Sequence, residues 1–291
     1  MEHKLVYVLH MLIVVLLHCL QTEFISYISR VIHLLFSNLV NCSSLSLGNA
    51  SSLPPRLPFL SPILRMLRDA KVTRPVTYIM VCCSYRGYWT SKGRPTENGI
   101  ALDAEATLSW IKKEEEQRVD TSACRKQINV VVWGQSIGAG VATTLAAKQD
   151  LFTKNVALKT LILETPFLGV RAMLETLYPQ KFLPYRYLWP FLRTHLDSWT
   201  ALAILKERST ELKIKPPNIV LLVAGRDELV PSSQSDILES RCASLGLSTR
   251  KEVIASAYHT EVLVRPGGRR AAVEAIQDSL KQHEVDEKVK L

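Results

Sequence analysis

The feature that most constrains the fold is a regular alternation of short apolar runs with helical patterns. Runs rich in Val, Ile and Leu lie at 76–83, 128–133, 160–164 and 218–224, and a more polar last strand is expected at 248–254. Helical patterns lie at 62–70, 99–113, 138–148, 235–245 and 269–282. Strands this apolar are typically covered on both faces. Because helical segments separate them, they predict an α/β fold with a mostly parallel sheet and helices on both faces.

The first 42 residues have a different character. Leu5–Leu20 is almost wholly apolar, interrupted only by two histidines, and is slightly short for a membrane-spanning helix. Phe24–Val40 carries one arginine and one histidine, as an amphipathic interfacial helix does. We expect residues 1–42 to form a membrane-associating segment, with buried helices as the alternative. The Ser- and Pro-rich residues 43–62 are expected to form a loop.

One stretch, residues 167–208, interrupts the alternation. Prolines divide it into short pieces, and it is rich in aromatic side chains: Tyr178, Phe182, Tyr185, Tyr187, Trp189, Phe191 and Trp199. An insertion between two sheet strands lies over the strand ends, so we expect a helical lid within a domain that spans 43–291. An aromatic lid suits an apolar ligand. The alternative is that these aromatics only pack the insertion onto the domain.

Composition excludes some classes of protein. The formal charge is +9 over 291 residues, but Lys and Arg are scattered, so we expect no nucleic-acid partner and instead a basic surface that favours anionic membranes. The six cysteines show no metal-binding spacing and are too few for a disulfide scaffold. Cys82 and Cys83 are neighbours in a predicted strand, so their side chains should point to opposite faces and fill the core.

The strongest chemical signal is Gly134-Gln135-Ser136-Ile137-Gly138. This pattern stands directly between an apolar strand and an Ala-rich helix, which is the setting of a nucleophile elbow. The flanking glycines let the chain turn sharply and lift Ser136 to the apex. A serine hydroxyl at such a position needs a base within reach and donors for the developing oxyanion.

The base and its orienting acid should follow the nucleophile in the order Ser, Asp, His. Asp227 comes directly after one predicted strand, and His259 comes in the loop after the last strand. Both therefore lie at the carboxyl ends of parallel strands, where open α/β sheets carry their sites. Glu228 is the rival acid. A structural turn for Asp227 and an ordinary surface position for His259 are the other interpretations.

Other motifs carry a resemblance to a known family. Beside the elbow they are Gly48-Asn49-Ala50, Tyr85-Arg86-Gly87-Tyr88, Leu163-Glu164-Thr165-Pro166-Phe167 and Gly225-Arg226-Asp227-Glu228-Leu229-Val230-Pro231. From about Gly48 to Gln282 the chain resembles the α/β-hydrolase superfamily. It is most similar to the membrane-tethered abhydrolase-domain branch, which includes fungal bud-emergence homologues, lysophospholipid and monoacylglycerol lipases, and protein depalmitoylases.

The resemblance implies a catalytic triad of Ser136, Asp227 and His259. It also implies an oxyanion hole from the backbone N–H of Ile137 and one from the Gly48-Asn49 loop, with Asn49 as the second residue of the hole. The chain departs from the family at Leu47, where members carry His, and at Trp89, where many carry Gly. Members also have a strand pair and a third strand before Gly48, so the amino-terminal strands are expected to be absent or altered here.

These observations predict a serine hydrolase that cleaves a carboxylic ester or thioester of an acyl-lipid or acylated substrate through an acyl-enzyme. Neither a metal nor an organic cofactor is implied, and membrane lipid is an expected partner. We expect the protein at a membrane that the sequence does not identify. The alternative is a non-catalytic membrane-associated protein that uses a degraded hydrolase fold for binding.

Overall fold

The computed structural model describes residues 32–34, 41–47, 54–70, 76–118, 128–153, 155–177 and 191–288. Along the chain the elements are β1 (Ile32–Leu34), β2 (Asn41–Leu47), η1 (Pro54–Arg56), α2 (Leu57–Asp69), β3 (Thr77–Cys83), α3 (Glu97–Arg118), β4 (Ile128–Gln135), α4 (Ile137–Ala147), η3 (Gln149–Leu151), β5 (Val156–Glu164), α5 (Val170–Leu177), α6 (Ser198–Glu211), β6 (Asn218–Ala224), α7 (Ser232–Ser244), β7 (Thr249–Ile254) and α8 (Pro266–Lys288). The described strands form one sheet in the order β1-β3-β2-β4-β5-β6-β7. Only β1 runs antiparallel to its neighbour, so the predicted, mostly parallel sheet is confirmed.

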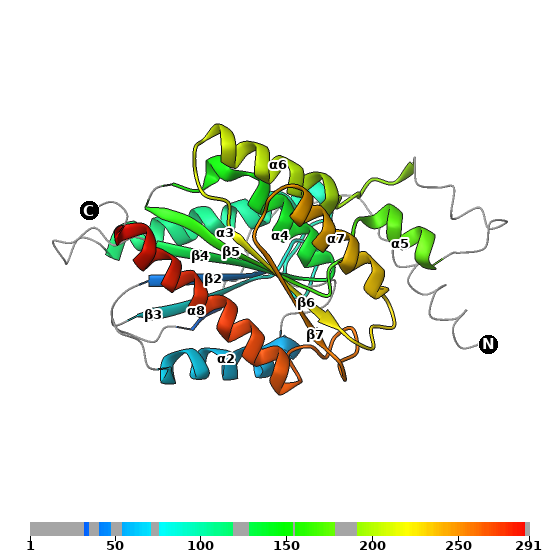
Figure 1. Ribbon diagram of the computed structural model, residues 1–291, viewed down its shortest axis with the longest axis horizontal. Helices are drawn as coiled ribbons and strands as arrows, with labels where there is room; N and C mark the ends of the chain where they lie inside the picture. Colours follow the sequence, from blue (N-terminus) through cyan, green and yellow to red (C-terminus); the bar gives the residue numbers. More distant parts are fainter. Residues whose placement is uncertain are drawn as a thin grey trace.

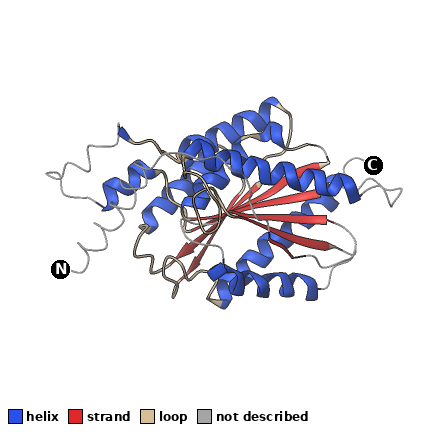
Figure 2. Ribbon diagram, turned by 180° about the vertical axis from the view of Figure 1, so that it is seen from behind, coloured by secondary structure: helices blue, strands red, loops and turns tan. Residues whose placement is uncertain are grey.

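The helices cover both faces of the sheet (Figures 1 and 2). On one face α3, α4 and α7 pack on the strands, and α6 lies over α4. On the other face α2 and α8 pack on the strands and on each other. Each face has its own apolar core, so the sheet is buried on both sides. This three-layer arrangement explains why the strands read as continuous apolar runs.

The central strand β2 overturns one sequence-based expectation. The loop predicted over residues 43–62 is wrong at both ends, because α2 begins at Leu57 and Asn41–Leu47 is a strand between β3 and β4. Two apolar neighbours offer it a full ladder of hydrogen bonds on both sides. This tertiary pairing outweighs the weak strand preference of serine.

The strand β1 corrects a second expectation. The prediction of an amphipathic helix over Phe24–Val40 is wrong at Ile32–Leu34. These residues form a strand that pairs antiparallel with Met80–Cys82 of β3. Within the described residues, one short strand thus stands where the family carries a strand pair, and β2 supplies the third strand. The first two residues of β2 also fall in the expected membrane-associating segment. The rest of that segment lies outside the described residues.

The strand β3 confirms the prediction for the two neighbouring cysteines. Cys83 belongs to the core beneath α3 and α4, and Cys82 to the core beneath α2 and α8. Burial raises the pKa of the Cys82 thiol to about 11 and that of the Cys83 thiol to about 12. Both side chains are therefore protonated core filler at neutral pH.

The carboxyl ends of the parallel strands meet at one edge of the sheet. Leu47 pairs with both Cys83 and Gly134, and Gln135 pairs with Glu164. The register continues across β6 to Ile254 at the end of β7. Each loop that follows one of the parallel strands therefore begins at this edge, which is where the predicted site residues lie.

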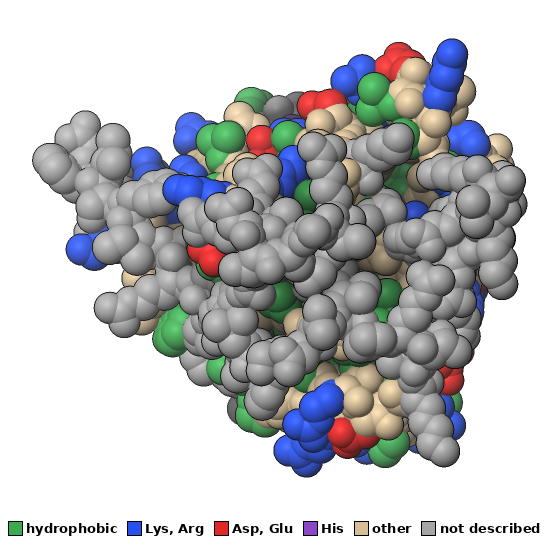
Figure 3. Space-filling model, turned by 90° about the vertical axis from the view of Figure 1, so that its left-hand side faces the viewer, with side chains coloured by type: hydrophobic (Ala, Val, Ile, Leu, Met, Phe, Trp, Pro, Cys, Tyr) green, Lys and Arg blue, Asp and Glu red, His purple; other side chains and the backbone are tan. Residues whose placement is uncertain are grey.

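On the face at the left of Figure 1, the Lys and Arg side chains of the described residues stand in several separate places (Figure 3). No helix in the described part of the chain is long and apolar enough to cross a membrane. Nor do the described residues include a group of His, Cys, Asp and Glu that could hold a metal ion.

Candidate active site

The nucleophile elbow is a strained turn. Ser136 follows β4 directly and precedes α4, with a φ of 53° and a ψ of −118°. A positive φ is uncommon for a residue other than glycine, and such strain persists only where the surroundings enforce it. The Ser136 N–H donates to the Glu164 carbonyl at 2.9 Å, and the Ser136 carbonyl accepts from the Ala139 N–H at 2.9 Å. The backbone of the serine is thus fixed from both sides.

The glycine before the elbow is required by close backbone contact. A Cβ atom on Gly134 would lie 2.0 Å from the carbonyl oxygen of Gly138, well inside any allowed separation. The end of β4 and the first turn of α4 therefore approach backbone to backbone. This is the sharp strand-to-helix turn that the sequence pattern predicts.

The expected oxyanion donors are only partly within the described residues. Ile137 opens α4, so its backbone N–H has no acceptor within the helix. Such groups at a helix amino terminus favour negative charge. Gly48 and Asn49 lie outside the described residues. The strand that precedes them ends at Leu47, which pairs with Gly134 beside the elbow.

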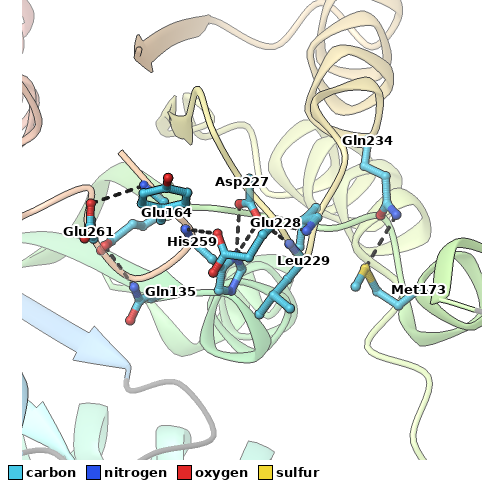
Figure 4. A network of polar contacts seen from close by, with 11 residues as sticks. Gln135, Glu164, Met173, Asp227, Glu228, Leu229, Gln234, His259 and Glu261 are labelled. Atoms are coloured by element: carbon cyan, nitrogen blue, oxygen red, sulfur yellow. Dashed lines mark hydrogen bonds and ion pairs between the residues drawn. The ribbon is translucent and has the colours of Figure 1, made fainter. Parts of the chain in front are cut away.

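The structure brings Asp227 and His259 together (Figure 4). The imidazole Nδ1 lies 2.9 Å from both carboxylate oxygens of Asp227, and each side chain is only 5% exposed. Asp227 follows β6, and His259 lies in the loop after β7. The two loops are tied by the Arg226 N–H, which donates to the Ala257 carbonyl at 2.9 Å.

Backbone groups orient the Asp227 carboxylate. Its Oδ1 accepts from the N–H groups of Leu229 and Val230 at 2.9 and 2.8 Å. An aspartate that accepts bonds from the residues just after it is a typical turn former. The structural-turn interpretation and the catalytic one therefore describe the same side chain. The turn aims the carboxylate at the imidazole.

The rival acid Glu228 has a different place. Its Oε2 accepts the backbone N–H of His259 at 3.0 Å, and the residue is otherwise exposed. Glu228 thus holds the main chain of the histidine, whereas Asp227 holds the ring. This separation favours Asp227 as the acid that sets the imidazole tautomer.

The serine and the histidine lie at the same edge of the sheet, but they are not hydrogen-bonded. Among the described residues, no hydrogen bond joins the Ser136 hydroxyl to His259. Because Asp227 occupies Nδ1, Nε2 is the ring atom left to take a proton. In free enzymes catalytic hydrogen bonds are often long and shorten only when substrate binds.

Sequence reasoning missed the part played by Glu164. This glutamate ends β5 and is fully buried. Its carboxylate accepts from the Arg56 guanidinium at 2.8 Å, the Trp133 indole at 3.1 Å and the Gln135 amide at 3.1 Å. An acidic residue at the end of an apolar strand was the available signal, because a buried charge requires partners.

The expected lid at 167–208 divides into two parts. The final helix, α6, packs on α4 through Leu202 and Leu205, which are fully buried in the core. Trp199 is not an isolated surface ring, because the Arg241 guanidinium lies 4.3 Å from its centroid. Residues 178–190, with most of the aromatics, lie outside the described residues.

The insertion leaves and rejoins the domain at a narrow neck. The Val170 N–H donates to the His195 carbonyl at 2.8 Å, and the Ser198 N–H donates to the Leu168 carbonyl at 2.9 Å. The two ends are also fixed to the domain by side chains. Gln234 of α7 accepts the Leu168 N–H at 3.0 Å, and Glu97 of α3 accepts the His195 N–H at 2.6 Å.

Gln234 extends this attachment to α5. Its amide nitrogen also donates to the Thr176 hydroxyl at 3.1 Å and lies 3.5 Å from the Met173 sulfur (Figure 4). No side chain of α5 is fully buried. Gln234 therefore links α5 to α7 through polar contacts rather than through buried apolar side chains of α5.

Comparison with known proteins identifies sequence relatives of this chain. No protein-family model matches the chain. It is 31% identical over 198 residues to Protein bem46 of Schizosaccharomyces pombe, a match that covers 68% of this chain and 54% of that protein. It is also 31% identical over 161 residues to lysophosphatidylserine lipase ABHD12 of Gallus gallus, covering 55% of this chain and 39% of that protein. The chain thus spans about half the length of Protein bem46, and less of the lipase.

Solved structures show the same fold. Esterase Pf2001 of Pyrococcus furiosus matches with a TM-score of 0.54 at 16% identity, over 84% of this chain and 81% of that one. Esterase B of Lactobacillus rhamnosis matches with a TM-score of 0.57 at 14% identity, over 86% and 80%.

The chain belongs to the α/β-hydrolase superfamily. Its sequence relatives place it in the branch that contains Protein bem46 and the abhydrolase-domain lipases.

Proposed function

We propose that this chain is a serine hydrolase that cleaves a carboxylic ester or thioester of an acyl-lipid or acylated substrate. The observation that carries the proposal is the buried contact between Asp227 and His259 at the sheet edge that also holds the Ser136 elbow. Relatives named as a lipase and structural neighbours named as esterases support ester chemistry at the level of the family.

The proposed reaction has two half-reactions, and His259 acts first as a base and then as an acid in each. His259 accepts the hydroxyl proton of Ser136 as its oxygen attacks the substrate carbonyl carbon. The imidazolium returns that proton to the leaving alcohol or thiol as the tetrahedral intermediate collapses to an acyl-enzyme. Water then attacks the acyl-enzyme with the same histidine as base, and Ser136 is regenerated. Asp227 keeps Nδ1 protonated and stabilises the imidazolium.

The oxyanion of each tetrahedral intermediate needs donors. Ile137 is the proposed first donor, because its N–H opens α4 directly after the nucleophile. The Gly48-Asn49 loop remains the proposed source of the second. Removal of one such donor typically lowers turnover about 10²–10³-fold, so the placement of this loop sets the rate that the chain can reach.

The apolar substrate class rests on the insertion and on the amino-terminal segment. Phe191 and Leu177 are exposed large apolar side chains on either side of residues 178–190. Leu5–Leu20 remains our proposed membrane-associating segment, since β1 and β2 belong to the sheet. Co-sedimentation of the full chain and of residues 21–291 with anionic vesicles tests this point. Equal binding of the two would contradict it.

A fluorophosphonate probe tests the catalytic proposal directly. It reacts with an activated serine, so we expect labelling of the wild-type chain at Ser136, confirmed by peptide mass spectrometry. Ser136→Ala should abolish labelling, and His259→Ala should slow it strongly. Ser235, a buried serine of α7, provides a matched control, because Ser235→Ala should label as the wild type does. A folded wild-type chain without labelling would favour the non-catalytic alternative.

A further inference from the structure

A second buried charge cluster lies beneath the elbow, and the proposed reaction makes no use of it. The Glu164 carboxylate is 1% exposed, and the Arg56 side chain opposite it is 11% exposed. Arg56 stands at the amino terminus of α2, whereas Glu164 ends β5, 108 residues further along the chain. The pair therefore joins the helix layer of one face to the centre of the sheet.

Three side chains bind the Glu164 carboxylate, one from the start of α2 and two from β4. Its Oε2 receives the Arg56 guanidinium and the Trp133 indole N–H, and its Oε1 receives the Gln135 amide. A guanidinium presents a rigid planar fork of N–H donors, so it fixes the orientation of the carboxylate that it faces. The cluster therefore holds the groups around it in place.

What it holds is the nucleophile. Gln135 directly precedes Ser136, and the Glu164 carbonyl accepts the Ser136 N–H at 2.9 Å. Glu164 thus contacts both residues through its side chain and its main chain. The serine backbone is strained at a φ of 53°, and a strained residue keeps its conformation only where its neighbours over-determine it.

Stability alone does not account for the cluster. Well-packed apolar side chains in place of a buried ion pair are often as stable or more stable, so buried pairs are retained in some proteins because they specify a geometry. Here the ion pair fixes where α2 begins, because Arg56 is the residue just before that helix. The strand that precedes α2 in the chain, β2, ends at Leu47, which pairs with Gly134 of the elbow.

We propose that Glu164 and Arg56 are positioning residues, whose buried ion pair fixes the Ser136 elbow relative to α2. The role rests on the proposed function of Ser136, but its structural part is independent of activity. A displacement of about 1 Å at a reacting atom costs on the order of 10²-fold in rate, so loosening the elbow should lower kcat rather than weaken substrate binding.

Four forms of the full chain test the proposal: Glu164→Gln, Arg56→Met, the double variant and Thr160→Val. Thr160 is a matched control, because it is fully buried in the same strand and its hydroxyl has no hydrogen-bond partner within the described residues. For each form we would measure the fluorophosphonate labelling rate, kcat and KM on a short p-nitrophenyl ester, and thermal stability.

Glu164→Gln and Arg56→Met should lower the labelling rate and kcat about 10- to 100-fold with KM changed less than about threefold. The double variant should regain thermal stability, because no charge is left unpaired, yet keep the low kcat. Thr160→Val should match the wild type. A double variant that regains both stability and rate would show that the pair only supports the fold, and it would overturn the proposal.

Hydrogen exchange of the peptide that contains the elbow separates this proposal from that of Ser136 as a nucleophile. Glu164→Gln should speed exchange about tenfold or more in this peptide and leave α8 unchanged, whether or not the chain is active. An unlabelled wild type would refute the proposed function. Unchanged exchange in the Glu164→Gln elbow would refute the positioning role.

Discussion

Two buried carboxylates lie near the carboxyl edge of the sheet, and their surroundings differ in kind. Asp227, after β6, faces an imidazole, which can gain and lose a proton. Glu164, at the end of the neighbouring strand β5, faces a guanidinium, which cannot. The first pair is suited to proton movement and the second to fixed geometry. The same edge of the sheet thus provides both the proton-transferring pair and the fixed ion pair of the proposed site.

The two carboxylates also differ in what holds them. Backbone N–H groups of the next few residues hold Asp227, so its position is set locally. Arg56, the residue just before α2, and two side chains of β4 hold Glu164, so its position depends on contacts between distant parts of the fold. A change at Asp227 should therefore be felt mainly in activity. A change at Glu164 should be felt in stability as well.

Asp227→Asn should produce the largest effect. The amide can still accept the turn hydrogen bonds, but it no longer fixes the imidazole tautomer, so kcat should fall about 10⁴-fold. The thermal midpoint should change little. Ester hydrolysis and a thermal melt of the same preparation measure both. Glu228→Gln serves as control and should keep kcat within a few fold, since its contact is to the His259 backbone. Equal losses in the two variants would contradict the separate roles of these acids.

Glu164→Ala should have the largest effect on stability. It leaves the Arg56 guanidinium buried without its carboxylate, and breaking a buried pair in this way typically costs about 3–5 kcal/mol. Urea unfolding followed by far-ultraviolet circular dichroism measures the loss. Asp227→Ala is the comparison within the same sheet edge and should cost distinctly less. A cost below about 1 kcal/mol at Glu164 would show that the cluster does not depend on charge pairing.

The loss of stability at alkaline pH should come from the thiols of β3 and not from either carboxylate cluster. The Cys83 thiol has an ordinary pKa of 9.0, which burial raises to about 12 in the folded chain. The folded state therefore binds more protons above pH 9, and the free energy of unfolding should fall as pH rises from there towards 12. The slope is at most about 1.4 kcal/mol per pH unit for each thiol.

Cys83→Ala should flatten this slope, and Asp227→Asn should leave it unchanged. Urea unfolding between pH 8 and about 11 tests both statements. A steeper alkaline loss in Asp227→Asn than in the wild type would show that the site and β3 are energetically coupled.

Trp89→Gly should produce the smallest effect. Trp89 has a φ of 48° and is 44% exposed, so glycine relieves backbone strain but removes a ring that is partly buried. Glycine also adds freedom to the unfolded chain, so the net change in the free energy of unfolding should stay within about 1 kcal/mol. A thermal melt measures the shift. Any change in fluorophosphonate labelling would show that the loop after β3 contributes to the site.

Much of the fold could be predicted from the sequence because the strands are covered on both faces. The predicted bounds of β6, Asn218–Ala224, agree with the structure, since its apolar run ends abruptly at both sides. The buried strands β3 and β4 were placed within a few residues for the same reason. The edge strand β7 is only partly buried, and its place was predicted from the alternation of strands and helices. The strand β2 could not be predicted, because its serines have no strand signal of their own and its conformation depends on β3 and β4.

The candidate site shows the same division. Ser136, Asp227 and His259 were predicted because each lies in the turn or loop that follows a strand, so their local sequences carry the signal. The partners of Glu164 could not be predicted, because nothing near Arg56 indicates a contact with a residue in a distant strand. Local sequence thus predicts which residues reach the sheet edge, but not which residues pair beneath it.

The neck of the insertion has a consequence for how this protein can diversify. The chain departs at Leu168 and returns by Ser198 through a single gap closed by its own backbone hydrogen bonds. No strand of the described sheet lies between these points, so the segment can change in length or sequence without altering any strand register. The neck therefore makes this segment an exchangeable unit. Exchanging this segment for that of a relative at these two junctions would test whether it governs ligand preference, with the sheet left unchanged.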